Sequence, residues 1–208
     1  MQYSWSQGGS SRSLQQELLR LQFVALALKT PFSMPTEVVT DRRIYERVIQ
    51  ETIAQAESFV WIATADIKDL HVDRGKRMVP FLSALSDLID DGVVVRIIHA
   101  KEPGPAFRND FDRFPNLLQG LEMILCPRAH FKTVIVDGKT AYTGSANLTG
   151  AGMGAKSENR RNFESGILSD EPKIVRPLMQ QFDALWMGER CQPCQRKDHC
   201  VTYHELLG

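Results

Sequence analysis

A single stretch of the chain, HFKTVIVDGKTAYTGSANLTG, gathers polar side chains around a short apolar run. His130 and Lys132 stand two residues apart, so on a strand they point to the same face. The pair Asp137-Gly138 is a hairpin signal, and a hairpin here brings Ser145 and Asn147 back level with His130. An imidazole, an ammonium, a hydroxyl and an amide are then expected around one small volume.

These four groups suit a phosphodiester. The charge on its non-bridging oxygens grows when phosphorus is attacked, and Lys132 and Asn147 can stabilise that charge. An imidazole of ordinary pKa can attack phosphorus directly and then depart as a leaving group. Because cationic and amide donors take the place of a metal ion, we expect catalysis that needs no cofactor.

The spacing resembles the signature of the phospholipase D superfamily, which is H-x-K-x4-D followed by G-S-x-N. The segments TIAQAESFVWIATADI and FLSALSDLIDDGVVVRIIHA upstream also resemble the first strand-helix-strand unit of that family, and the likeness extends over residues 40–187. The resemblance implies that His130 is the nucleophile that forms a phosphohistidine. It implies that Lys132 and Asn147 bind phosphate, and that Ser145 adds a hydrogen bond.

Two acidic residues have different roles in this resemblance. Asp137 corresponds to a structural aspartate that braces the turn, and Glu164 to a downstream acid that orients a histidine. Between Asn147 and Glu164 the sequence is glycine-rich and basic. Its cationic side chains either guide a polyanion to the site or are simply solvated; they are Lys156, Arg160 and Arg161.

The implied mechanism needs two histidines, one to attack and one to protonate the leaving oxygen. The chain has one complete motif, because His99-Ala100-Lys101 lacks the aspartate and the Gly-Ser-x-Asn that should follow. We therefore expect a two-fold homodimer that places both His130 side chains in one cleft. The single-motif members of the family resemble this arrangement.

The elements around these residues predict an α/β fold. Two apolar, β-branched segments, 59–67 and 93–100, flank a segment of helical periodicity at 78–92, which predicts a parallel strand pair with a crossover helix. We expect a mixed sheet flanked by helices on both faces, as in a phospholipase D-like sandwich. The remaining predicted strands are 121–126, 130–138, 139–145 and 162–170; the remaining predicted helices are 40–58, capped by Thr40 or Asp41, and 171–189.

The bulk composition is that of a soluble globular protein, with 208 residues, 43% hydrophobic and 24% charged. Twenty-five basic and 25 acidic residues cancel, so overall charge does not mark a nucleic-acid or membrane-surface binder. No apolar run approaches the ~18 residues of a membrane span, so we expect no stable membrane insertion and a cytoplasmic location. The predicted parts are a flexible start and helix (1–39), a catalytic domain (40–188) and a Cys/His-rich tail (189–208).

Three of the four cysteines fall in the tail, within CQPCQRKDHC. This spacing is typical of a zinc knuckle, in which thiolates and imidazole bind structural Zn²⁺ tetrahedrally. Because His199 and Cys200 are adjacent and not easily directed at one ion, His204 or Cys126 is an alternative fourth ligand. An iron–sulfur cluster, a disulfide or an unbound tail are the other possibilities. The predicted ligands are Cys191, Cys194, His199 and Cys200.

The motif identifies the bond that is cleaved but not the substrate. We favour a nuclease acting on DNA or RNA, because a zinc-like tail commonly serves nucleic-acid contacts. A phospholipase D or phosphatidyl transferase acting on lipid is the second possibility, and a non-catalytic subunit of a DNA-processing or defence complex is the third. A protein partner could dock on the N-terminal helix or on the tail.

Overall fold

The structure is a computed structural model of the chain, and it describes residues 36–75 and 77–206. The helix predicted within residues 11–28 lies outside the described residues. Within the described part, no helix is long and apolar enough to cross a membrane.

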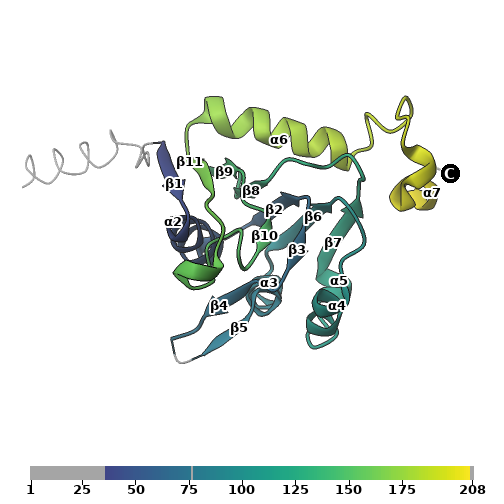
Figure 1. The fold of residues 1–208 in the computed structure, drawn as a ribbon. Coiled ribbons are helices and arrows are strands. Elements are labelled where there is room, and N and C mark those ends of the chain that lie inside the picture. The colour runs from purple at the N-terminus through teal and green to yellow at the C-terminus, as the bar shows by residue number, and fades with distance from the viewer. Residues whose placement is uncertain (1–35, 76, 207–208) are drawn as a thin grey trace, which may run out of the picture. The chain divides into compact units, whose positions relative to one another are not determined.

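Seven strands form one mixed sheet in the order β1-β11-β9-β8-β2-β6-β7 (Figure 1). The pairs β2–β6 and β6–β7 are parallel and the others antiparallel, which confirms the predicted parallel pair and the predicted mixed sheet. Two short ladders, β10–β3 and β4–β5, lie outside this sheet. The strands are β1 (Glu37–Thr40), β2 (Phe59–Thr64), β3 (Ile67–Lys68), β4 (His71–Asp73), β5 (Met78–Pro80), β6 (Val94–His99), β7 (Leu121–Leu125), β8 (Thr133–Val136), β9 (Thr140–Gly144), β10 (Leu148–Thr149) and β11 (Ser165–Ser169).

Helices cover both faces of the sheet (Figure 1). One face carries α3 and a continuous helix made of α2, η1 and η2, in which η1 has the wider π-helical form. The other face carries α6, which has a proline in its first turn. The helices are α2 (Arg42–Ile44), η1 (Tyr45–Thr52), η2 (Ile53–Gln55), α3 (Phe81–Asp90), α4 (Pro105–Phe111), α5 (Leu117–Gly120), η3 (Glu158–Arg160), α6 (Pro172–Trp186), η4 (Lys197–His199) and α7 (Val201–Leu206).

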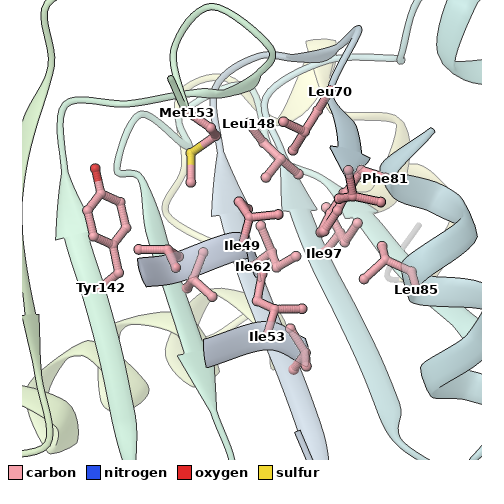
Figure 2. Close-up of a cluster of buried hydrophobic side chains, with 14 of the residues drawn as sticks. Ile49, Ile53, Ile62, Leu70, Phe81, Leu85, Ile97, Tyr142, Leu148 and Met153 are labelled. Atoms are coloured by element: carbon pink, nitrogen blue, oxygen red, sulfur yellow. The ribbon is translucent and has the colours of Figure 1, made fainter. Parts of the chain in front are cut away.

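The larger core lies beneath the helix of residues 42–55. Figure 2 shows Ile49 and Ile53 of this helix meeting Ile62 of β2, with Ile97 of β6 and Leu85 of α3 beside them. All five side chains are buried, and burying each contributes about 1.5–3 kcal/mol. The alternation of inward and outward residues along β2 and β6 places every second side chain in this core.

A second core on the other face is built from aromatic rings. Phe182 of α6 stacks on Trp61 of β2 with ring centroids 4.9 Å apart, and on Trp186 at 5.9 Å. The Arg96 guanidinium lies over Trp186 at 4.9 Å. The two cores fix the sheet between its helices, so the strand ends at each edge have defined positions.

Two local predictions were wrong. β8 begins at Thr133 and not at His130, because its ladders with β2 and β9 begin at the pairs Thr133–Ala63 and Thr133–Thr143. His130 and Lys132 therefore lie in the loop that leads into β8. Asp41 precedes the helix of residues 42–55 but makes no side-chain cap, because its carboxylate binds elsewhere.

Candidate active site

Five predicted site residues come to one edge of the seven-stranded sheet. β9 runs parallel to β2 while β8 and β11 run the opposite way, so the end of β9 lies beside the starts of β8 and β11. The loop into β8 carries His130 and Lys132. The segment after β9 carries Ser145 and Asn147, and the residue before β11 is Glu164. We call this edge of the sheet, with these five residues, the His130 edge.

Ser145 and Glu164 are joined across β9 and β11. The Ser145 hydroxyl donates a short hydrogen bond to Glu164 Oε2, and it accepts one from the Ser165 backbone N–H at 3.1 Å. The other carboxylate oxygen, Oε1, accepts from Asn162 Nδ2 at 3.1 Å. Both oxygens of Glu164 thus have partners, and the structure records no hydrogen bond from His130 to Glu164 within its described part.

Asp41 at the end of β1 braces Glu164 from the other side. The Asp41 N–H donates to the Glu164 carbonyl at 3.0 Å, and the Glu164 N–H donates to Asp41 Oδ1 at 2.9 Å. Asp41 has a positive φ of 46°, and Gly154 packs so closely that a Cβ there would lie 2.3 Å from the Asp41 carbonyl oxygen. The position of Glu164 therefore depends on β1, which the sequence did not reveal as a strand.

His130 and Lys132 lie next to one another in the loop before β8. The side chain of His130 is exposed, while its neighbour Ala129 is buried and anchors the loop. Lys132 Nζ donates to the His130 carbonyl at 2.6 Å, and the Gly144 N–H donates to the Lys132 carbonyl at 3.2 Å. An accessible imidazole and an ammonium group thus stand together at the end of β9.

Asn147 is oriented by Thr64, the buried last residue of β2. Thr64 Oγ1 accepts from the Leu148 N–H at 3.0 Å and lies 3.4 Å from Asn147 Oδ1. With its carbonyl oxygen toward Thr64, the Asn147 side chain leaves its Nδ2 donors for another acceptor. Thr64 was not among the predicted site residues, although its place near the end of a predicted strand was a usable signal.

Asp137 lies at the opposite edge of the sheet, in the turn between β8 and β9. Its carboxylate accepts backbone N–H groups that open β2. Burial raises the pKa of Asp137, but these donors outweigh burial and the net shift is downward. Asp137 and Gly138 both have positive φ, as a tight hairpin turn requires. The donors are Glu57, Ser58 and Phe59, at 3.1, 2.8 and 2.9 Å.

Two facing glycines make room for a tyrosine under the His130 edge. Gly144 and Gly166 are register partners, and a Cβ on Gly166 would lie 2.4 Å from the Tyr142 ring. A Cβ on Gly144 would lie 2.5 Å from the Tyr142 hydroxyl and from the Ser165 carbonyl oxygen. Burial, with a smaller contribution from Glu164, raises the pKa of Tyr142 to about 12, so its hydroxyl stays protonated. Sequence reasoning missed Tyr142.

The basic residues of the loop before β11 fall into two kinds. Lys156 Nζ is 2.6 Å from Asp69 Oδ2 and is partly buried, so the ion pair holds it in place. Arg160 is exposed, and the half-buried Arg161 follows it next to the His130 edge. Phe163, which stands two residues after Arg161 and directly before Glu164, is 96% exposed.

Two other histidines, His99 of the main sheet and His71 of the separate β4–β5 ladder, are less available than His130. His99 at the end of β6 is 0% exposed, and burial lowers its pKa. His71 Nδ1 is 3.5 Å from Asp69 Oδ1. The remaining two, His199 and His204, are exposed and belong to the tail.

The predicted metal ligands of the tail are not gathered into a preformed site. All four cysteines are reduced and half-buried, whereas His199 is exposed. Among the residues that the structure describes, no group of three or more His, Cys, Asp or Glu side chains is arranged to hold a metal ion.

Comparison with known proteins assigns most of the chain to one family. A family profile described as "Cardiolipin synthase, PLD-like domain" matches residues 49–186. The mitochondrial cardiolipin hydrolase of Chlamydomonas reinhardtii is 33% identical over 101 residues, which are 48% of this chain and 43% of that protein. The one of Danio rerio is 37% identical over 65 residues, 31% of this chain and 26% of that protein. The chain thus spans less than half the length of both curated relatives.

The fold is also found among solved structures. The phospholipase D family member Nuc from Salmonella typhimurium superimposes with a TM-score of 0.55 at 21% identity. The match covers 73% of this chain and 93% of Nuc. The likeness therefore extends over nearly all of the Nuc chain.

Proposed function

Because the chain belongs to the phospholipase D-like family described as "Cardiolipin synthase, PLD-like domain", we propose that it is a phosphodiesterase that works through a phosphohistidine. The observation that carries this proposal is the convergence of five polar side chains at the adjoining ends of β8, β9 and β11. Those side chains are His130, Lys132, Ser145, Asn147 and Glu164.

His130 is the nucleophile in this proposal. One of its ring nitrogens attacks phosphorus, the bond from phosphorus to the leaving oxygen breaks, and a second imidazole supplies the proton that this oxygen takes up. That imidazole then removes a proton from water, which attacks phosphorus and frees His130. Lys132 and the Nδ2 group of Asn147 stabilise the charge on the non-bridging oxygens. Ser145 and Glu164 act as positioning residues through their mutual hydrogen bond.

The second imidazole comes from a second copy of the chain. His99 is buried and His71 is paired with Asp69, so neither offers a free imidazole beside His130. The exposed side chain of His130 can face its own copy across a two-fold axis. Mixing wild-type protein with an excess of His130→Ala protein tests this, because mixed dimers would lack one imidazole. We expect activity to fall below the value set by dilution alone, and strictly proportional loss would contradict the dimer.

Nucleic acid is the substrate that the surface of the His130 edge favours. Phe163 is almost fully exposed, with Arg161 two residues away, and an exposed aromatic ring beside cations can stack on a base while the cations contact phosphates. Lipid is the second candidate, since the curated relatives are named cardiolipin hydrolases. Near Glu164 the described chain exposes Phe163 and the register partners Val38 of β1 and Ile167 of β11, which is little apolar surface for a bilayer to contact.

A substrate panel in EDTA separates these functions. Purified protein is incubated with single-stranded DNA, double-stranded DNA, RNA and cardiolipin-containing vesicles. Nucleic-acid products are followed by electrophoresis, and lipid products by chromatography of the phospholipids. We expect cleavage of nucleic acid that survives EDTA and disappears in His130→Ala. His204→Ala, which removes an exposed imidazole from α7, is the matched control and should stay active. Turnover of lipid alone would contradict the nuclease, and no turnover of any substrate would favour a non-catalytic subunit.

A further inference from the structure

Four cysteines from separate parts of the sequence surround one cavity. Cys126 follows β7, Cys191 and Cys194 lie in the turns after α6, and Cys200 joins η4 to α7. All four line the same cavity of about 240 Å³, and all are half-buried and reduced. The exposed His199 does not line it. The tertiary structure thus adds Cys126 to the thiols of the tail and leaves His199 out.

Hydrogen bonds already hold these segments together. The Cys194 N–H donates to the Cys191 carbonyl at 3.0 Å, which closes the C-x2-C turn. The Cys200 thiol donates to the Leu125 carbonyl at 3.4 Å, and the Leu125 N–H donates to Thr202 Oγ1 at 2.8 Å. The tail is therefore fastened to the end of β7, directly before Cys126.

The charges around the cavity complement a thiolate–metal centre. Four thiolates and one Zn²⁺ carry a net charge of −2, and no carboxylate lines the cavity. Arg128 Nη1 lies 3.6 Å from Cys194 Sγ, and the Arg196 N–H donates to the same sulfur at 3.4 Å, as outer donors to a metal-bound thiolate do. The cationic side chains that line the cavity are Arg128, Arg190, Arg196 and Lys197.

We propose that Cys126, Cys191, Cys194 and Cys200 bind one structural Zn²⁺. In the structure no three of these thiols are arranged for a metal, so binding must draw the C-x2-C turn and Cys200 toward Cys126, with release of the thiol protons. Four thiolates in a closed tetrahedron are a common structural zinc set. Cys126 lies four residues before His130, and its carbonyl accepts from the Ala129 N–H at 2.8 Å, so the ion would tie the tail to the loop of the His130 edge.

Metal analysis of the full-length protein tests the ligand set. Protein purified without chelator is assayed for metal by mass spectrometry, together with Cys126→Ser, Cys200→Ser and, as the matched control, His199→Ala. We expect about one zinc per chain in the wild type and in His199→Ala. In either serine variant we expect the affinity for zinc to fall by at least about tenfold. Stoichiometric zinc in Cys126→Ser, or its loss from His199→Ala, would overturn the ligand set.

A spectroscopic titration keeps the test decisive if a serine variant folds poorly. Co²⁺ added to metal-free wild-type protein should give the d–d bands of a tetrahedral site and a thiolate charge-transfer band that Zn²⁺ abolishes. Iron with labile sulfide, a disulfide among the four cysteines, or four freely reactive thiols in the purified protein would each overturn the proposal. The phosphodiesterase assay in EDTA is a separate readout, since this ion takes no part in the reaction steps proposed for His130.

Discussion

The β8–β9 hairpin reaches two opposite edges of the main sheet, and the polar side chains at these edges differ in whether they have hydrogen-bond partners. At the turn of the hairpin, Asp137 is fully engaged by three backbone N–H groups. At the open end, His130 is exposed and the Nδ2 group of Asn147 has no partner recorded within the described chain. A satisfied buried group stabilises the fold, whereas donors without partners are available to bind a ligand.

The largest expected effect comes from removing the exposed imidazole. In His130→Ala we expect kcat/KM to fall by about 10⁴-fold or more, because no other group can form the covalent intermediate. The free energy of unfolding should change by less than about 0.5 kcal/mol, because the side chain is exposed. Initial rates on a labelled oligonucleotide and urea denaturation measure the two quantities. A large loss of stability in this variant would show that His130 has a structural role.

The next effect concerns the support beneath the His130 edge. In Gly144→Ala the new Cβ would lie 2.5 Å from the Tyr142 hydroxyl and the Ser165 carbonyl oxygen. We expect a loss of about 2–3 kcal/mol of stability and a fall of about 10²-fold in kcat/KM, because Ser145 is displaced. Gly104→Ala is the control, since nothing lies within 4 Å of a Cβ there and its φ is −71°. Equal stability and equal kcat/KM in the two variants would show that the close packing of Gly144 supports neither the fold nor the activity.

At the opposite edge, Asp137→Asn should reduce stability by about 1–2 kcal/mol and leave kcat/KM unchanged, because charge-assisted bonds to β2 are lost far from His130. The folded-state pKa of Asp137 is lowered, so its stabilisation is present above the ordinary aspartate pKa and is lost as pH falls through the lowered one. The stability gap between wild type and variant should therefore narrow below about pH 4. Urea denaturation from pH 7 to pH 3 checks this, and a gap that widens on acidification would contradict it.

The smallest expected effect concerns the basic loop. In Arg161→Ala we expect KM for single-stranded DNA to rise about two- to fivefold and its salt dependence to weaken, with kcat unchanged. Lys156→Ala should change KM less, because Lys156 is held by Asp69. Lys139→Ala, a cation paired with Glu57 at the opposite edge, is the control. A larger rise in KM for Lys156→Ala than for Arg161→Ala would contradict the expectation that a cation held in an ion pair contributes less to substrate binding.

Much of the architecture could be predicted because local signals carry it. Apolar periodicity located β2, α3, β6 and α6, and the positive-φ turn at Asp137-Gly138 closes the predicted hairpin. Topology then follows from general rules of strand connection, including the parallel β2–β6 pair. The candidate residues of the His130 edge were also visible, because their spacing resembles one family's signature.

Other features depend on pairing between residues far apart in the chain. β1 has an ordinary sequence and becomes a strand only because β11 offers it a partner. β8 begins at Thr133 because its pairing with β2 and β9 begins there, and Asp41 braces Glu164 across 123 residues. No local pattern encodes such contacts, since each depends on a partner from a distant segment of the chain.

The sequence by itself determined which chemical groups the protein has and most of the segments that become strands and helices, because residue type and periodicity are local properties. Only the tertiary structure decided which polar groups are satisfied and which are left to bind, since that depends on neighbours from distant segments. His130 and Asp137 are seven residues apart and lie at opposite edges of the sheet. Cys126 lies 65 residues before Cys191, and the two line one cavity.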